Sequence, residues 1–238
     1  MIVVGALAAA AAAFTLSASA GLGGSLLLVP ALGLLLGPKQ GVALAALLLA
    51  CNNVFKTALY RQTIPWRAAL GVLVLTVVGA FVGAQLMVSV PAAVVAGGVV
   101  CGLIAALVFE VRGLQLGRTA ASPALAFLAG ATSGFSGTSG PLKGVAIRNL
   151  GLDRRHFVGA ASLVSLGGDL TKTAVFAGAG LLDETSLWIA ACAVPLMALG
   201  SLSGRRLNLA IGEPAFFALF WLVMVGYAAR LLVTGVSG

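Results

Sequence analysis

Apolar residues run through this chain in long blocks that are separated by short polar interruptions. A helix needs roughly 20 apolar residues to cross the hydrocarbon core of a bilayer, because each residue adds about 1.5 Å. Blocks near that length lie at residues 2–20, 41–60, 66–90, 91–110, 157–178, 186–203 and 214–237. Backbone polar groups must find partners within the chain in lipid, so each block predicts a membrane-spanning helix.

Two apolar segments of the second half, about 122–133 and 141–150, are shorter and are separated by a break rich in glycine and serine. Each would cover only about half of a membrane. The first half has a similar break within "SASAGLGGSLLLVP", which begins at Ser17 and follows the first apolar block. Each pair of short helices either re-enters the membrane from one side or makes two short, tilted crossings.

The sequence matches itself when it is shifted by 116 residues. Matches between leucines or alanines mean little in this composition, but paired glycines and a shared triplet in one ungapped frame indicate a duplication. The chain is therefore predicted to contain two related halves, about 1–118 and 119–238, within one integral membrane domain. The matched positions are Gly21 with Gly137, Gly24 with Gly140, and Lys56-Thr57-Ala58 with Lys172-Thr173-Ala174.

Composition excludes a water-soluble globular domain. Of the 238 residues, 61% are hydrophobic and 8% are charged, and the mean hydropathy is +1.13. Soluble domains carry about 25% charged residues. The predicted fold class is therefore an all-α polytopic membrane protein that contains two inverted-topology repeats. Each repeat is a broken helical hairpin followed by three transmembrane helices.

The inversion follows from counting crossings and is tested by the distribution of charge. The pair of short helices crosses the membrane either twice or not at all, and three full-length helices follow it. Each half therefore crosses an odd number of times, so the second half starts on the side of the membrane opposite to the first. Cytoplasmic loops of membrane proteins carry an excess of Lys and Arg. One side receives the loops with Arg61, Arg67, Arg112, Arg118, Arg154, Arg155, Arg205 and Arg206. The other side receives Lys39, an uncharged turn, Asp183, Glu184 and the C-terminal tail.

The basic side is therefore expected to be cytoplasmic, with both termini on the non-cytoplasmic side. The net charge of +8 then carries topology information and does not indicate a nucleic-acid partner. Cys51, Cys101 and Cys192 stand singly in apolar segments, so we expect neither a metal site nor a disulfide framework. Nothing in the pattern calls for a cofactor.

Inverted repeats with broken helices at matching positions are typical of secondary transporters. A helix that begins inside the membrane exposes free N–H groups and about half a positive charge, which favours an anion. Glycine and serine also permit close helix packing, which is the alternative explanation of each break. The candidate anion-binding residues are Gly21, Gly23, Gly24 and Ser25 in the first break and Gly137, Thr138, Ser139 and Gly140 in the second.

Charged residues inside the apolar blocks extend this candidate site, because a charge at membrane depth is costly without a partner. Lys143 follows the second break and is the candidate counter-charge for the anion. Lys56 and Lys172 are equivalent in the repeat, and each either serves the anion or extends to the nearest interface. Asp169 lies three residues before Lys172 and can neutralise it, whereas Asn53 takes the equivalent place before Lys56. Asp169 is also the candidate for a coupling proton or cation.

The glycine segments resemble those of the sulfite exporter TauE/SafE family. The matching segments are "GLGGSLLLVP" from Gly21 and "SGFSGTSGPLKGVAIRNLGLDRRHFVGAASLV" from Ser133. Ser139 and Ala146 depart from the usual glycine and proline. The resemblance covers essentially the whole chain. It implies a non-enzymatic transporter of sulfite, organosulfonates or thiosulfate in a prokaryotic plasma membrane, and it leaves the particular anion and the coupling ion open.

Three other functions would require different residues or a different transport mode. An intramembrane serine protease would use one of two G-x-S-G motifs, at 134–137 or 137–140, and would need a nearby histidine. The chain has one histidine, His156, which lies in a basic loop. A cation channel or transporter would need several carboxylates inside the membrane, where Asp169 stands alone. An anion channel is the remaining alternative.

Overall fold

The computed structural model describes residues 2–20, 24–112, 122–138 and 140–207, together with Leu222 and Gly226. In this part of the chain all regular structure is helical, as the sequence predicts. The elements are α1 (Ile2–Ala20), α2 (Ser25–Leu36), α3 (Pro38–Leu59), the 3-10 turn η1 (Arg61–Thr63), α4 (Trp66–Ser89), α5 (Ala92–Arg112), α6 (Ser122–Ser136), α7 (Gly140–Arg148), α8 (Arg154–Gly178) and α9 (Glu184–Leu207).

These helices coincide with the predicted blocks. The predicted short pair is present as α6, with 15 residues, and α7, with 9 residues. Within the described ranges, α3 and α4 are the two helices that are long and apolar enough to cross a membrane by length and composition. The last predicted block, 214–237, lies outside the described residues except for Leu222 and Gly226.

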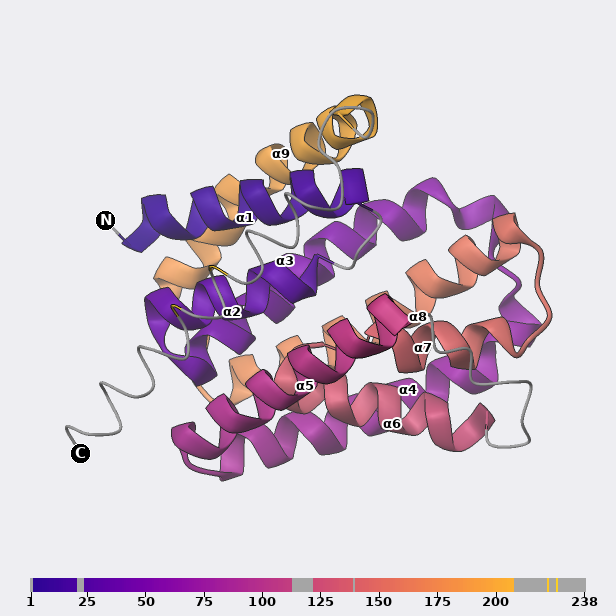
Figure 1. The fold of residues 1–238 in the computed structure, drawn as a ribbon, viewed down its shortest axis with the longest axis horizontal. Helices are drawn as coiled ribbons and strands as arrows, with labels where there is room; N and C mark the ends of the chain where they lie inside the picture. Colours follow the sequence, from indigo (N-terminus) through magenta and orange to yellow (C-terminus); the bar gives the residue numbers. More distant parts are fainter. Residues whose placement is uncertain are drawn as a thin grey trace.

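The helices form two bundles, each of which combines elements from both halves of the sequence. In Figure 1, α1 lies beside α9 at the top of the view, and α4 lies beside α6 at the bottom. The first bundle contains α1, α2, α3 and α9, and the second contains α4, α5, α6, α7 and α8. The largest contact between the bundles joins α3 to α8.

Helices α3 and α8 run in opposite directions where they meet. Asn53 of α3 bonds to Asp169 of α8, and the Thr63 carbonyl oxygen after α3 packs against Gly159 near the start of α8. Residue numbers thus rise along α3 while they fall along α8. As a result, the η1 turn and the start of α8 lie at the same end of the molecule.

Helices α4 and α6 approach each other closely enough for their backbones to touch. A Cβ atom at Gly79 would overlap the Phe127 carbonyl oxygen, and one at Gly130 would overlap the Thr76 carbonyl oxygen. The Thr76 hydroxyl donates to the Ala126 carbonyl oxygen at 3.2 Å. Small residues at such crossings are common in membrane proteins, because dispersion contacts between helices replace the hydrophobic effect there.

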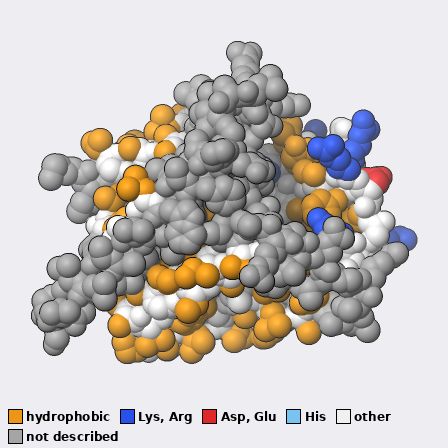
Figure 2. Space-filling model, in the orientation of Figure 1, with side chains coloured by type: hydrophobic (Ala, Val, Ile, Leu, Met, Phe, Trp, Pro, Cys, Tyr) orange, Lys and Arg blue, Asp and Glu red, His pale blue; other side chains and the backbone are white. Residues whose placement is uncertain are grey.

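The outer face of α4 is apolar, as expected for a helix in contact with lipid. Its exposed side chains recur every four residues and are between 46% and 56% exposed: Leu70, Val74, Val78, Val82 and Leu86. Figure 2 shows apolar side chains over much of the surface that is not drawn in grey, with Lys and Arg gathered toward one end. Water would oppose a continuous apolar stripe of this kind, whereas hydrocarbon accommodates it.

Candidate anion site

The second glycine break is a sharp turn between α6 and α7. Gly137 has φ +77°, a conformation that side-chain-bearing residues rarely adopt, and its N–H donates to the Ser133 carbonyl oxygen at 2.9 Å. A Cβ atom at Gly137 would lie 2.8 Å from Val29 Cγ2 of α2. Both the backbone conformation and the close approach of α2 therefore require glycine here.

Thr138 follows this turn and is 3% exposed. Its hydroxyl has no hydrogen-bond partner among the described residues. Buried hydroxyls are normally paired, because leaving one unpaired costs about 1–3 kcal/mol. The unpaired hydroxyl lies two residues before Gly140, where α7 begins with N–H groups that lack partners within the helix. This end of α7 can therefore donate several hydrogen bonds to an anion.

Lys143 lies one turn into α7 and is half-buried. Its ammonium donates to the Ser165 hydroxyl of α8 at 2.8 Å. An ammonium has three donors, and within the described ranges Lys143 has no carboxylate at ion-pair distance. Lys143 therefore keeps an uncompensated charge and spare donors near the break.

Lys172 and Asp169 form the predicted ion pair in the interior. Lys172 is 1% exposed, and its ammonium lies 2.8 Å from Asp169 Oδ1. It also donates to the Ser133 hydroxyl of α6 at 3.0 Å. The other carboxylate oxygen of Asp169 accepts from the Asn53 amide of α3 at 2.6 Å. Both oxygens of Asp169 are thus occupied, and the network joins α3, α6 and α8.

We call the following residues the polar cluster: Asn53, Lys56, Ser133, Lys143, Ser165, Asp169 and Lys172. The charges of Lys56, Asp169 and Lys172 all act on the Lys143 ammonium. Three lysines and one aspartate give the polar cluster a formal charge of +2 (3 − 1). Lys56 is exposed, so the buried and half-buried members Lys143, Lys172 and Asp169 carry one excess positive charge, which is unfavourable until an anion compensates it.

The structure brings together half of the predicted site residues that it describes, namely the charged residues and Asn53. Asn53, Asp169, Lys172 and Lys143 join one cluster, and Lys56 acts on it electrostatically from an exposed position. Gly24 and Ser25 lie at the start of α2. Gly21, Gly23 and Ser139 lie outside the described residues.

Ser133 and Ser165 bond to the lysines of the polar cluster and are not among the residues predicted from the sequence. Ser133 lies one turn before the end of α6, and its equivalent in the first half is Ser17, so the repeat register could have indicated it. Ser165 lies four residues before Asp169 and therefore on the same face of α8. Neither serine stands out by composition, because serine is common in both breaks.

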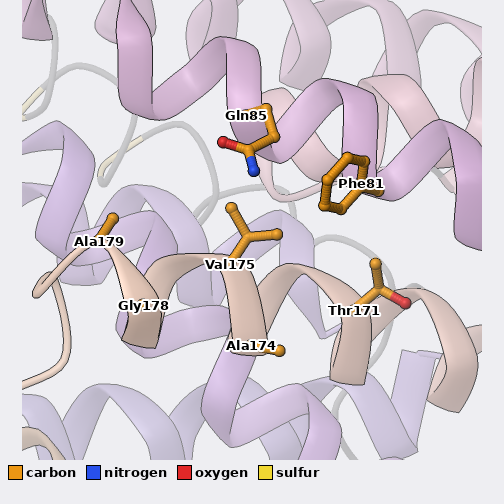
Figure 3. A pocket seen from close by; sticks show the side chains of 7 residues that line it. All are labelled: Phe81, Gln85, Thr171, Ala174, Val175, Gly178 and Ala179. Atoms are coloured by element: carbon orange, nitrogen blue, oxygen red, sulfur yellow. The ribbon is translucent and has the colours of Figure 1, made fainter.

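A groove of about 570 Å³ lies between α4 and α8, apart from the polar cluster. Figure 3 shows Phe81 and Gln85 of α4 on one side and Thr171 and Val175 of α8 on the other. The remaining lining residues are small, and none of the residues around the groove is charged. The groove therefore lacks the positive charge that an anion site needs.

Ser136 and His156, which the protease alternative could use, are engaged elsewhere, and Ser139 of the second G-x-S-G motif lies outside the described residues. The Ser136 hydroxyl donates to the Thr132 carbonyl oxygen at 2.8 Å. His156 is exposed, and its Nδ1 lies 2.8 Å from Asp153 Oδ2. Asp153 caps α8, and its hydrogen bonds from the His156 backbone N–H and side chain lower the pKa of the carboxyl group. This arrangement is a helix cap and does not favour the protease alternative.

The helical bundles and the apolar outer stripe of α4 are those expected of an integral membrane protein, and the polar cluster carries an excess of positive charge. A family model described as sulfite exporter TauE/SafE matches residues 6–231. The chain therefore belongs to the sulfite exporter TauE/SafE family, which is a family of membrane transporters, as the glycine segments predicted. Comparisons with curated proteins and with solved structures gave no match.

Proposed function

We propose that this protein is a secondary transporter that moves a small sulfur-containing anion across the plasma membrane by alternating access. The family description suggests sulfite, and organosulfonates and thiosulfate are further candidates because they are small sulfur oxyanions as well. The observation that carries the proposal is the uncompensated positive charge of the polar cluster beside the broken helix. An anion that binds there relieves the cost of that buried charge.

The anion would be held where α7 begins. Candidate donors are the Thr138 hydroxyl, the backbone N–H groups of Gly140 and Leu142 on either side of Pro141, and the Lys143 ammonium. A sulfur oxyanion offers several acceptor oxygens, which suits donors that converge from different directions. The repeat-related residues Gly21, Gly23, Gly24 and Ser25 would supply the second helix end.

Two features of the packing support inverted halves with a boundary near residues 118–119. Helix α8 runs antiparallel to its repeat equivalent α3, and they bond through Asn53 and Asp169, which are 116 residues apart. This separation equals the repeat shift, as expected where a two-fold axis passes between equivalent positions. The pairing of α6 with α4 is likewise matched by that of α1 with α9.

The same packing supports the proposed orientation. The basic loop near Arg61 and Arg67 and the start of α8, with Arg154 and Arg155, share one end of the molecule. Lys39, at the start of α3, bonds to the Val88 carbonyl oxygen near the end of α4, and so lies at the other end. The first of these ends would be cytoplasmic under the positive-inside rule, with both termini outside.

A thermal-shift screen of the purified protein tests the substrate class. We expect sulfite, thiosulfate or a small sulfonate to raise the melting temperature, with carboxylates of similar size giving smaller shifts. At 100 times its Kd, a ligand adds about 2.7 kcal/mol to the stability of the folded state. The proposal is wrong if no sulfur oxyanion produces a saturable shift.

Counterflow in liposomes separates alternating access from the anion-channel alternative. Vesicles loaded with unlabelled anion should transiently accumulate labelled anion from outside, because a carrier returns across the membrane with substrate bound. A channel only equalises the label and gives no such overshoot. Absence of an overshoot in protein that binds the anion would favour the channel.

A further inference from the structure

Two lysines that are equivalent in the repeat differ in exposure and in bonding. Lys172 of α8 is 1% exposed and is bonded to Asp169 and Ser133. Lys56 of α3 is exposed, and its ammonium has no hydrogen bond or ion pair with any described residue. At equivalent positions, α8 therefore carries a buried and paired lysine, whereas α3 carries an exposed one.

Asp169 lies where either lysine can reach it. It is three residues before Lys172 on α8, and its second oxygen bonds to Asn53, which is three residues before Lys56 on α3. Because Asn53 and Asp169 occupy equivalent positions and touch, the carboxylate lies next to the axis that relates the two halves. The Asp169 carboxylate therefore has two possible cationic partners, Lys56 and Lys172, and in this structure it pairs with Lys172.

We propose that Asp169 exchanges its ion pair between Lys172 and Lys56 when the transporter changes the side to which its site opens. This inference rests on the proposed transport function, because only a transporter with inverted halves needs two opposite-facing states. In the other state, Lys56 is buried beside Asp169 and Lys172 is exposed. Asp169 and the two lysines are thus positioning residues, and Lys143 holds the anion.

The exchange follows from the relation between the halves. Rotation about an axis in the membrane plane converts a state that faces one side into a state that faces the other, so equivalent helices exchange their environments. Removing one partner of a buried ion pair is strongly destabilising, because it leaves an unpaired charge in the interior. Exchange of partners keeps Asp169 paired in both states and avoids this cost.

Mass spectrometry after brief acetylation of the purified protein tests the exchange, because the chain has only four lysines, at 39, 56, 143 and 172. In the unmodified protein, Lys56 should react roughly tenfold or more faster than Lys172, because a buried amine reacts only through opening. Lys39 and Lys143 serve as internal references.

The decisive variant moves the carboxylate from α8 to α3 without changing the net charge, as Asn53→Asp/Asp169→Asn. The carboxylate now lies three residues before Lys56, so Lys56 should become protected and Lys172 should become reactive. If the pair in the unmodified protein is only a fixed structural brace, Lys172 stays slow and Lys56 stays fast. That result, or a charge-swapped protein that does not fold, overturns the proposal.

A second variant tests the exchange with Asp169 in place. In Lys172→Met the carboxylate has lost its partner, so Lys56 should take over and its acetylation rate should fall roughly tenfold. The matched variant Lys56→Met should leave the rate at Lys172 unchanged. Unaltered reactivity of Lys56 in folded Lys172→Met also overturns the proposal. The assay contains no anion, so failure here leaves the anion screen to decide the proposed function.

Discussion

Lys143 gives the sharpest test of the anion site, because the structure leaves it a free charge. Among the described residues its ammonium uses one donor, on Ser165, which leaves two donors for a ligand. Two unit charges about 4 Å apart attract by about 4 kcal/mol at an effective dielectric constant of 20. Desolvation of both groups reduces this gain, and hydrogen bonds to charged groups contribute about 1.5–3 kcal/mol net. We expect Lys143→Ala to weaken anion binding by about 10- to 150-fold.

Isothermal titration of the purified variant with the anion selected by the thermal-shift screen measures this loss. Lys143→Arg should keep part of the affinity, because it retains the charge but presents a planar group in place of a compact ammonium. Lys39→Ala is the matched control, since Lys39 bonds to the Val88 carbonyl oxygen at one end of the bundle and lies outside the polar cluster. The reasoning is refuted if Lys143→Ala is folded and binds the anion with unchanged Kd.

Three further predictions concern the glycines and the topology. Gly24→Val and Gly140→Val put a branched side chain where the anion would meet the backbone, so we expect folded protein without the ligand-induced rise in melting temperature. A lower melting temperature with an undiminished ligand shift would instead indicate a packing role. Gly130→Val forces α4 and α6 apart and should cost about 1–3 kcal/mol in a melting experiment while the ligand shift persists; an unchanged melting temperature would contradict the close packing. The topology can be tested by cysteine labelling in a variant whose three native cysteines are replaced by alanine. A cysteine appended after Gly238 should react with membrane-impermeant reagents from outside, whereas Gln115→Cys should not. External labelling of Gln115→Cys would exclude the inverted topology.

The helices of this protein could be predicted from sequence because the bilayer allows few alternatives. An apolar block in lipid must pair its own backbone groups, so block length and polar breaks nearly fix where helices begin and end. The ungapped repeat and the glycine segments then indicated the family, which the match over residues 6–231 confirms. The pair of Asp169 and Lys172 was also predictable, because residues three apart lie on one face of a helix.

Which helices pair and which polar side chains meet in the interior was decided by tertiary packing alone. Nothing local pairs α4 with α6 or places Asn53 against Asp169, because these contacts join residues 50 and 116 apart. The roles of Ser133 and Ser165 depend on which lysine reaches them across a helix interface, and serine itself carries no such information. The contrast between Lys56 and Lys172 also arises only in the assembled structure, because burial of Lys172 beside Asp169 and Ser133 depends on how α6, α3 and α8 pack together.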